Sequence, residues 1–138
     1  MLKALFDTNV LISAFLTDGL CSKLLSRANK REFKLYTCPF ILAEFEEKLH
    51  KRFSVSISEI KEALTLIKEL PFIIDPIEGN VQVKGACRDS NDDLILACAL
   101  AAKADFLVTG DKDLLTIGIY QGIRIITPRD FELLFDDG

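Results

Sequence analysis

Carboxylates stand at four widely separated places in this sequence. Asp7 follows a short apolar run, Glu44 lies inside the apolar sequence LAEF, and Asp111 closes the segment FLVTGD. Asp92 and Asp93 open the apolar stretch NDDLILACALAAK. Crowded carboxylates repel one another and lose hydration, so that a cation is needed to keep them ionised. Oxygen ligands without His or Cys favour Mg²⁺ or Mn²⁺ over zinc, and such a centre can activate water for in-line attack on a phosphate.

The order of apolar and amphipathic segments predicts an α/β architecture. Strands separated by helices pair in parallel, with helices on both faces of one sheet. Segment 75–89 contains one Pro and two Gly and has no clear period, which indicates a loop. We expect strands at 3–6, 34–37, 72–74, 105–109 and 124–127, and helices at 9–16, 20–31, 39–53, 59–70, 91–103, 112–116 and 128–135.

This order of elements would bring the acids to one edge of the sheet. Ligands of open parallel sheets bind beyond the carboxyl ends of the strands. Asp7 directly follows the first expected strand, and Asp111 directly follows the fourth. Helix 91–103 runs antiparallel to the strand that it feeds, so that Asp92 lies at the same edge. Glu44 lies near the start of the helix that leaves the second strand, and we therefore expect the four carboxylates to share one site.

Each acid also has a simpler explanation. Asp7 and Asp111 could cap the helices that follow them, and Ser90 with Asp93 approximates a capping box. Glu44 could belong to a solvated helix face, as most such acids do. Capping needs only one acid at each helix start, however, and it does not require an acid within LAEF. The set as a whole therefore favours a shared site.

Composition limits the class of protein. The chain has 138 residues, of which 49% are hydrophobic and 28% charged, and this fits one folded domain covering 1–138. The net charge of −4 argues against general coating of nucleic acid but does not exclude a local acidic pocket. No apolar run approaches the about 18 residues needed to cross a bilayer, and the N-terminus lacks a signal-peptide pattern. We expect a cytoplasmic protein that does not associate with membranes.

The other residues that often carry chemistry show no pattern of their own. The four cysteines lack the C-x-x-C spacing of a zinc or redox motif, and buried free thiols are expected rather than a disulfide framework. The single histidine, His50, lies in the basic sequence KLHKRF, which makes histidine-based acid–base catalysis unexpected. The four cysteines of the chain are Cys21, Cys38, Cys87 and Cys98.

Four segments together resemble a known family. FDTNVLISA, LAEFEEKL, DSNDDLILACALAAKADFLVTGD and RIITPRDF are similar, in this order, to the motifs of the PIN-domain nucleases. The closest resemblance is to the VapC-like toxin components of prokaryotic toxin–antitoxin systems, and it covers essentially the whole chain. The resemblance implies a three-layer α/β/α sandwich with a central, mostly parallel five-stranded sheet. It also implies an Mg²⁺- or Mn²⁺-dependent endoribonuclease that cleaves single-stranded RNA.

The resemblance assigns roles to individual residues. The four acids of the family fall on Asp7, Glu44, Asp92 and Asp111, as both metal ligands and catalytic residues. For the third acid, Asp92 fits the family spacing to a later aliphatic and a later small residue, while Asp93 stays open as the alternative or as a supporting acid. The residues expected to support the acids are Asn9, Asp93, Thr109 and Asp113.

Basic residues are candidates for binding the RNA substrate, and the resemblance also implies protein partners. Lys48, Lys51 and Arg52 form the best basic cluster for binding RNA, although such residues often form a solvated helix end. Arg88 precedes the third acid and could contact a phosphate. The resemblance further implies a small antitoxin that covers the acidic pocket, and a homodimer formed through helices of the first half.

Three other functions compete with a nuclease. A haloacid-dehalogenase-type phosphatase needs a D-x-D motif, whereas this chain has D-T-N at Asp7. A receiver domain needs a lone Asp after a middle strand and a Lys after the last strand, and neither stands where it is expected. A catalytically silent PIN-fold module that binds RNA or a protein partner stays open, although a mere scaffold gains nothing from clustered like charges. Melting with and without Mn²⁺ would separate this module from a nuclease.

Overall fold

The computed structural model describes residues 1–70, 72–73 and 82–135, and these residues build one six-stranded sheet. The strand order is β3-β2-β1-β4-β6-β5, in which five strands are parallel and β5 alone runs antiparallel to β6. The mostly parallel sheet with five parallel strands is therefore confirmed. The strands are β1 (Lys3–Phe6), β2 (Lys34–Thr37), β3 (Phe72–Ile73), β4 (Phe106–Val108), β5 (Ile119–Tyr120) and β6 (Ile123–Ile126).

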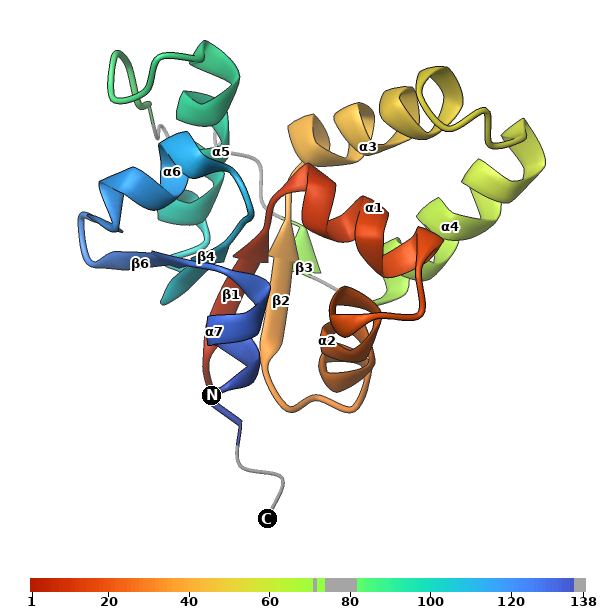
Figure 1. Ribbon diagram of the computed structural model, residues 1–138, viewed down its shortest axis with the longest axis horizontal. Helices are drawn as coiled ribbons and strands as arrows, with labels where there is room; N and C mark the ends of the chain where they lie inside the picture. The colour runs from red at the N-terminus through yellow and green to blue at the C-terminus, as the bar shows by residue number, and fades with distance from the viewer. Residues whose placement is uncertain (71, 74–81, 136–138) are drawn as a thin grey trace.

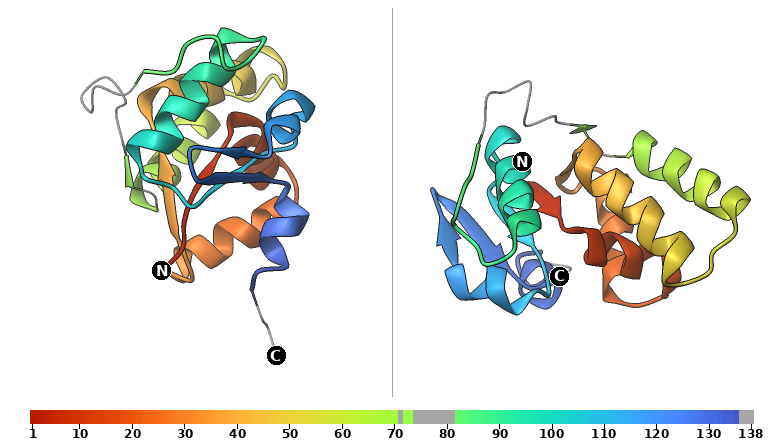
Figure 2. Two further views of the ribbon diagram at one scale, coloured as in Figure 1. Left: turned by 90° about the vertical axis from the view of Figure 1, so that its left-hand side faces the viewer. Right: turned by 90° about the horizontal axis from the view of Figure 1, so that it is seen from above.

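Helices connect the strands and cover both faces of the sheet. Seen from above in Figure 2, α5 lies on one side of β1 and α1 lies on the other, which gives the expected three layers. Helix α5 packs on β1 and β4, while α1 packs on α2 and α3. The helices among the described residues are α1 (Thr8–Leu16), α2 (Leu20–Asn29), α3 (Pro39–Lys51), α4 (Ile57–Glu69), α5 (Ser90–Ala101), α6 (Lys112–Ile117) and α7 (Pro128–Glu132).

The observed bounds differ from the expected ones mainly at element ends. Helix α4 begins earlier than expected because Ser56 caps it, its hydroxyl accepting a hydrogen bond from the Glu59 N–H. Strand β5 was not expected from the sequence.

Residues 74–81, which include part of the expected third strand and of the expected loop, lie outside the described residues. None of the described helices combines the length and the hydropathy needed to span a bilayer.

The register of the central strands aligns their carboxyl ends. Strands β1 and β2 point upward to α1 and α3 in Figure 1. Phe6, the last residue of β1, pairs with Val108, the last residue of β4. The Asp7 N–H continues this ladder by donating to the Val108 carbonyl at 3.1 Å. The residues that follow β1 and β4 therefore leave the sheet side by side.

The last helix is attached to the core by an aromatic cluster and an ion pair. The buried Phe131 ring contacts the rings of Phe6 and Phe33 edge to face. Arg27 of α2 is also buried, and its Nε and Nη2 donate to the two Glu132 carboxylate oxygens at 2.9 and 2.6 Å. Such a bidentate pair fixes the orientation of the partners as well as their distance. It therefore holds α7 against α2.

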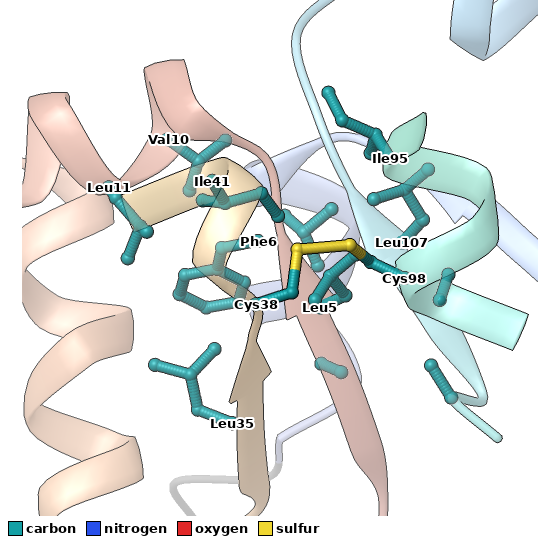
Figure 3. Close-up of a cluster of buried hydrophobic side chains, with 14 of the residues drawn as sticks. Leu5, Phe6, Val10, Leu11, Leu35, Cys38, Ile41, Ile95, Cys98 and Leu107 are labelled. Carbon is teal, nitrogen blue, oxygen red and sulfur yellow. A yellow bond between two sulfur atoms is a disulfide. The ribbon is translucent and has the colours of Figure 1, made fainter. Parts of the chain in front are cut away.

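Cys38 and Cys98 form a disulfide bridge, with 6.3 Å between their Cα atoms. The expectation of free thiols is therefore wrong for this pair, whereas Cys21 and Cys87 are free. Cys38 lies at the carboxyl end of β2 and Cys98 lies in α5, 60 residues later, so that only the tertiary structure brings them together. Figure 3 shows the bridge among buried apolar side chains next to Leu5.

Candidate functional site

A polar pocket of about 200 Å³ opens at the carboxyl edge of β1 and β4. This volume has room for several water molecules and hence for a hydrated ion. All four expected acids line it, and they come from four separate parts of the chain. The lining residues are Asp7, Thr8, Asn9, Glu44, Lys48, Arg52, Asp89, Asn91, Asp92, Ile95 and Asp111.

Asp7 both caps α1 and faces the pocket. Its Oδ1 accepts from the Val10 N–H at 2.9 Å, and its Oδ2 accepts from the Thr109 hydroxyl. The residue is only 4% exposed. Burial raises the pKa of Asp7 above its ordinary value, nearby Asp111 raises it further, and the bonds from Thr109 and Val10 oppose this rise. Capping and participation in a shared site are therefore compatible at this position.

Asp111 is positioned by the turn that leaves β4. Its N–H donates to the Thr109 hydroxyl oxygen at 3.0 Å. Its Oδ1 accepts from the N–H groups of Asp113 and Leu114, at 2.8 and 3.3 Å, and so caps α6. One carboxylate oxygen of Asp111 thus caps α6. Within the part of the chain that the structure describes, the other oxygen accepts no hydrogen bond, which leaves it available to a ligand.

Three carboxylates approach one another closely enough to hold a cation. Asp92, Asp111 and Asp113 each offer an oxygen, and these atoms all lie within 4.8 Å of one another. The pKa of Asp92 is raised to about 6, first by burial and then by repulsion from Asp111, Asp89, Asp113 and Asp7. A divalent cation would relieve this repulsion. The donor set consists of hard oxygens, so the residues present fit Mg²⁺ or Mn²⁺.

Asp93 points to a different part of the structure. Its two carboxylate oxygens accept from the N–H groups of Gly85 and Cys87, at 3.0 and 2.9 Å. Asp93 is buried and does not line the pocket. The interaction also bears on Cys87, because burial and the neighbouring Asp93 raise the pKa of that thiol to about 12. Asp93 therefore binds the segment before α5, while Asp92 faces the pocket.

Glu44 reaches the pocket from α3. Its Oε1 accepts a hydrogen bond from the Thr8 hydroxyl and lies 3.9 Å from the Lys48 Nζ. Lys48 in turn donates to Asn9 Oδ1 at 3.3 Å. Glu44 is therefore part of a polar network that joins the start of α1 to α3.

A family model described as PIN domain matches residues 3–113, which contain all four expected acids. The chain belongs to the PIN-domain family. PIN domains are generally nucleases, and the resemblance of the sequence motifs to this family is confirmed.

A solved structure supports the same fold for this PIN domain. It is VapBC2 from Rickettsia felis, bound to a DNA fragment from its promoter. The TM-score is 0.66 at 20% sequence identity, and the match covers 91% of this chain and 98% of the other. At this identity the likeness establishes the fold. No curated protein matches this chain.

The basic residues expected to bind substrate separate into two groups in the PIN domain. Lys48 and Arg52 line the acidic pocket. Lys51 instead pairs with Glu47 at 3.1 Å on the exposed face of α3. Arg88 is exposed and does not line the pocket. Two of the four basic side chains, those of Lys48 and Arg52, therefore lie in the same pocket as the acids.

Three polar residues of the pocket were not singled out from the sequence. Thr8 follows Asp7 directly, and Asp89 and Asn91 flank the start of α5. Asp89 caps α5 by accepting from the Asn91 N–H at 2.9 Å. The only signal for them in the sequence is a polar side chain next to an expected ligand. That signal is too common to select them.

We expect the stability of the metal-free PIN domain to increase as the pH falls from 7.5 to 5. Asp92 has a pKa of about 6 in the folded protein against an ordinary value of 3.8, so the folded state binds a proton that the unfolded chain does not. This contribution to the free energy of unfolding is complete below pH 3.8 and is lost as the pH rises through 6. Melting temperatures in EDTA across this range would measure it.

Asp92→Asn is the control for this pH dependence. Because the variant cannot titrate at this position, its melting temperature should change less than that of the wild type between pH 5 and 7.5. Parallel profiles for the two proteins would contradict the assigned pKa shift.

Proposed function

We propose that this PIN domain is an Mg²⁺- or Mn²⁺-dependent endoribonuclease that cleaves single-stranded RNA, as the toxin of a toxin–antitoxin pair. One observation carries the proposal. Asp7, Glu44, Asp92 and Asp111 line one pocket, although the sequence separates them by up to about a hundred residues. Membership of a family of nucleases supports the reaction class.

In this proposal the ligands of the divalent ion are Asp7, Glu44, Asp92 and Asp111. Asp113 supports them with a further carboxylate. One carboxylate oxygen from each of Asp92, Asp111 and Asp113 already lies within 4.8 Å of the other two. Asp92 is the third ligand rather than Asp93, because Asp92 lines the pocket, whereas Asp93 does not line it and instead binds the N–H groups of Gly85 and Cys87. A divalent ion held there would supply Lewis-acid stabilisation of the charge that develops on the phosphate during attack by water.

The other pocket residues bind substrate and orient the acids. Lys48 and Arg52 would bind phosphates of the RNA strand, since they are the cations in the pocket wall. Thr109 holds the Asp7 carboxylate through its hydroxyl, and Asn9 holds Lys48. A carboxylate oxygen of these acids that does not contact the ion would accept the proton of the attacking water.

The partners are proposed from the fold likeness and the sequence resemblance. The similar structure is a VapBC2 complex, and we propose that a small antitoxin covers the acidic pocket of this chain as well. We also propose a homodimer formed through helices of the first half. A cytoplasmic location stays a prediction, and the Cys38–Cys98 disulfide is unusual for that compartment.

The metal site can be tested by melting with Mn²⁺, with EDTA as the reference. We expect Mn²⁺ to raise the melting temperature of the wild type and of the control Glu62→Gln, whose exposed side chain lies on α4. Asp92→Asn should lose this shift because it removes a ligand. Asp93→Asn should keep the shift even if it is less stable without metal.

Cleavage of single-stranded RNA and single-stranded DNA by the same proteins tests the reaction. We expect RNA to be cut only with Mg²⁺ or Mn²⁺, and cutting to stop in Asp92→Asn. Undiminished cutting by that variant would overturn the proposed nuclease site. RNA binding without a metal shift or cutting would indicate the catalytically silent module instead.

A further inference from the structure

Thr8 occupies an unusual position between two of the acids. It is the first residue of α1, directly after Asp7, and its side chain is 2% exposed. Its hydroxyl donates to Oε1 of Glu44, 36 residues away on α3. The contact therefore joins the helix that leaves β1 to the helix that leaves β2.

Glu44 is the pocket acid that most needs such a contact. Asp7 is short, and the Val10 N–H of its own helix fixes one of its oxygens. Glu44 has one more rotatable bond, and its side chain is 19% exposed. Ordering a long acidic side chain costs rotamer entropy. A fixed donor removes part of that cost before a ligand binds.

Lys48 is a weaker constraint on Glu44 than Thr8 is. Among the described residues, Thr8 and Lys48 are the two polar partners of the Glu44 carboxylate. The Lys48 Nζ is 3.9 Å from Oε1, its side chain is partly exposed, and it also donates to Asn9. Pairs of this kind contribute little and adapt easily. The Thr8 hydroxyl comes from a buried side chain at a helix start, so its position is set by the fold.

We propose that Thr8 is a positioning residue that holds the Glu44 carboxylate in the orientation needed to bind the divalent ion. This inference rests on the proposed function, because it assigns Thr8 a role at the same metal site. The arrangement has a counterpart at Asp7, whose carboxylate accepts a hydrogen bond from the Thr109 hydroxyl. Two threonine hydroxyls thus preorganise acids that lie on different elements.

Thr8→Val and Thr8→Ser separate this role from packing. Valine keeps the shape of threonine and replaces the hydroxyl with a methyl group, whereas serine keeps the hydroxyl and loses the methyl group. Because Glu44 is partly exposed, water can replace the lost donor in Thr8→Val, and the metal-free melting temperature should change little. Thr65→Val, at an exposed position of α4, is the matched control.

The experiment measures the melting temperature of each protein as a function of Mn²⁺ concentration, and RNA cleavage at saturating Mn²⁺. We expect Thr8→Val to need about 10-fold more Mn²⁺ than the wild type for the same rise in melting temperature, as for other residues that orient metal ligands. Thr8→Ser and Thr65→Val should stay close to the wild type.

Each other outcome overturns the inference in a recognisable way. A normal Mn²⁺ response of Thr8→Val would overturn the role of Thr8 and leave the proposed function intact. Equal weakening in Thr8→Val and Thr8→Ser would show that packing matters and the hydroxyl does not. A wild type without any Mn²⁺ response would overturn the proposed function, and the role of Thr8 with it.

Discussion

Asp7→Asn should lower the rate of RNA cleavage about 100-fold or more without unfolding the protein. A bound metal contributes several kcal/mol of charge stabilisation in the transition state, and each 1.36 kcal/mol corresponds to a factor of ten in rate. Asp7 lines the pocket and directly follows β1. Asparagine retains the size of the side chain but removes its charge. Single-turnover cleavage with saturating Mn²⁺ measures the effect.

Although Asp7→Asn should lower the cleavage rate, it should not lower the stability of the metal-free protein. Asparagine can still accept from the Val10 N–H through its carbonyl oxygen, and its amide can donate to the Thr109 hydroxyl oxygen. Burial raises the pKa of Asp7, which means that its negative charge opposes folding at neutral pH. The metal-free melting temperature of Asp7→Asn should therefore be equal to or higher than that of the wild type.

Asp18→Asn provides the matched control for this experiment, because Asp18 is exposed and lies in the turn after α1. It should cleave RNA at the wild-type rate. Unchanged cleavage by Asp7→Asn would contradict the proposed site. A large fall in the melting temperature of Asp7→Asn would instead show that the carboxylate is needed for the fold.

Reduction of the Cys38–Cys98 disulfide should lower the free energy of unfolding by about 4 kcal/mol, from the loop-entropy relation. The bridge closes a loop of 60 residues, and its loss frees the unfolded chain more than the folded one. It also joins the start of α3 to α5, the helices that carry Glu44 and Asp92. Urea denaturation with and without a dithiol reductant measures the difference.

Two observations would contradict the role of the bridge. The first is an unfolding free energy that does not change on reduction. The second is a thiol titration that finds four free cysteines in the untreated protein. The double variant Cys38→Ala, Cys98→Ala is the control, since its unfolding should not depend on the reductant.

Much of the fold could be predicted from local pattern. Strands β1, β2, β4 and β6 lie where short apolar runs between helices predicted them. Helix α5 lies where the apolar stretch NDDLILACALAAK predicted it, and it is buried from Ile95 to Ala99. Strand β5 was missed because it has two residues and depends on the turn at Gln121 and Gly122, both with positive φ. So short a strand has no period to detect.

Four of the acids that line the pocket were expected from the sequence, as were Asn9, Lys48 and Arg52, whereas other neighbours of the acids were not. Asp7 and Asp111 follow parallel strands, and the carboxyl ends of such strands meet at one edge for any sequence of this pattern. Thr8 escaped notice because its partner, Glu44, stands 36 residues away. Lys51 and Arg52 are neighbours in the sequence, yet only Arg52 lines the pocket.

The sequence by itself determined most of the elements and the edge at which the carboxylates gather, because hydrophobic periodicity and the succession of strands and helices along the chain are local properties. The tertiary structure alone decided how individual side chains are used. Asp92 and Asp93 are consecutive on α5 and point roughly 100° apart, so the packing of the helix directs one to the pocket and the other to Gly85 and Cys87. The Cys38–Cys98 bridge likewise depends on how β2 and α5 pack across the sheet, which no spacing in the sequence encodes.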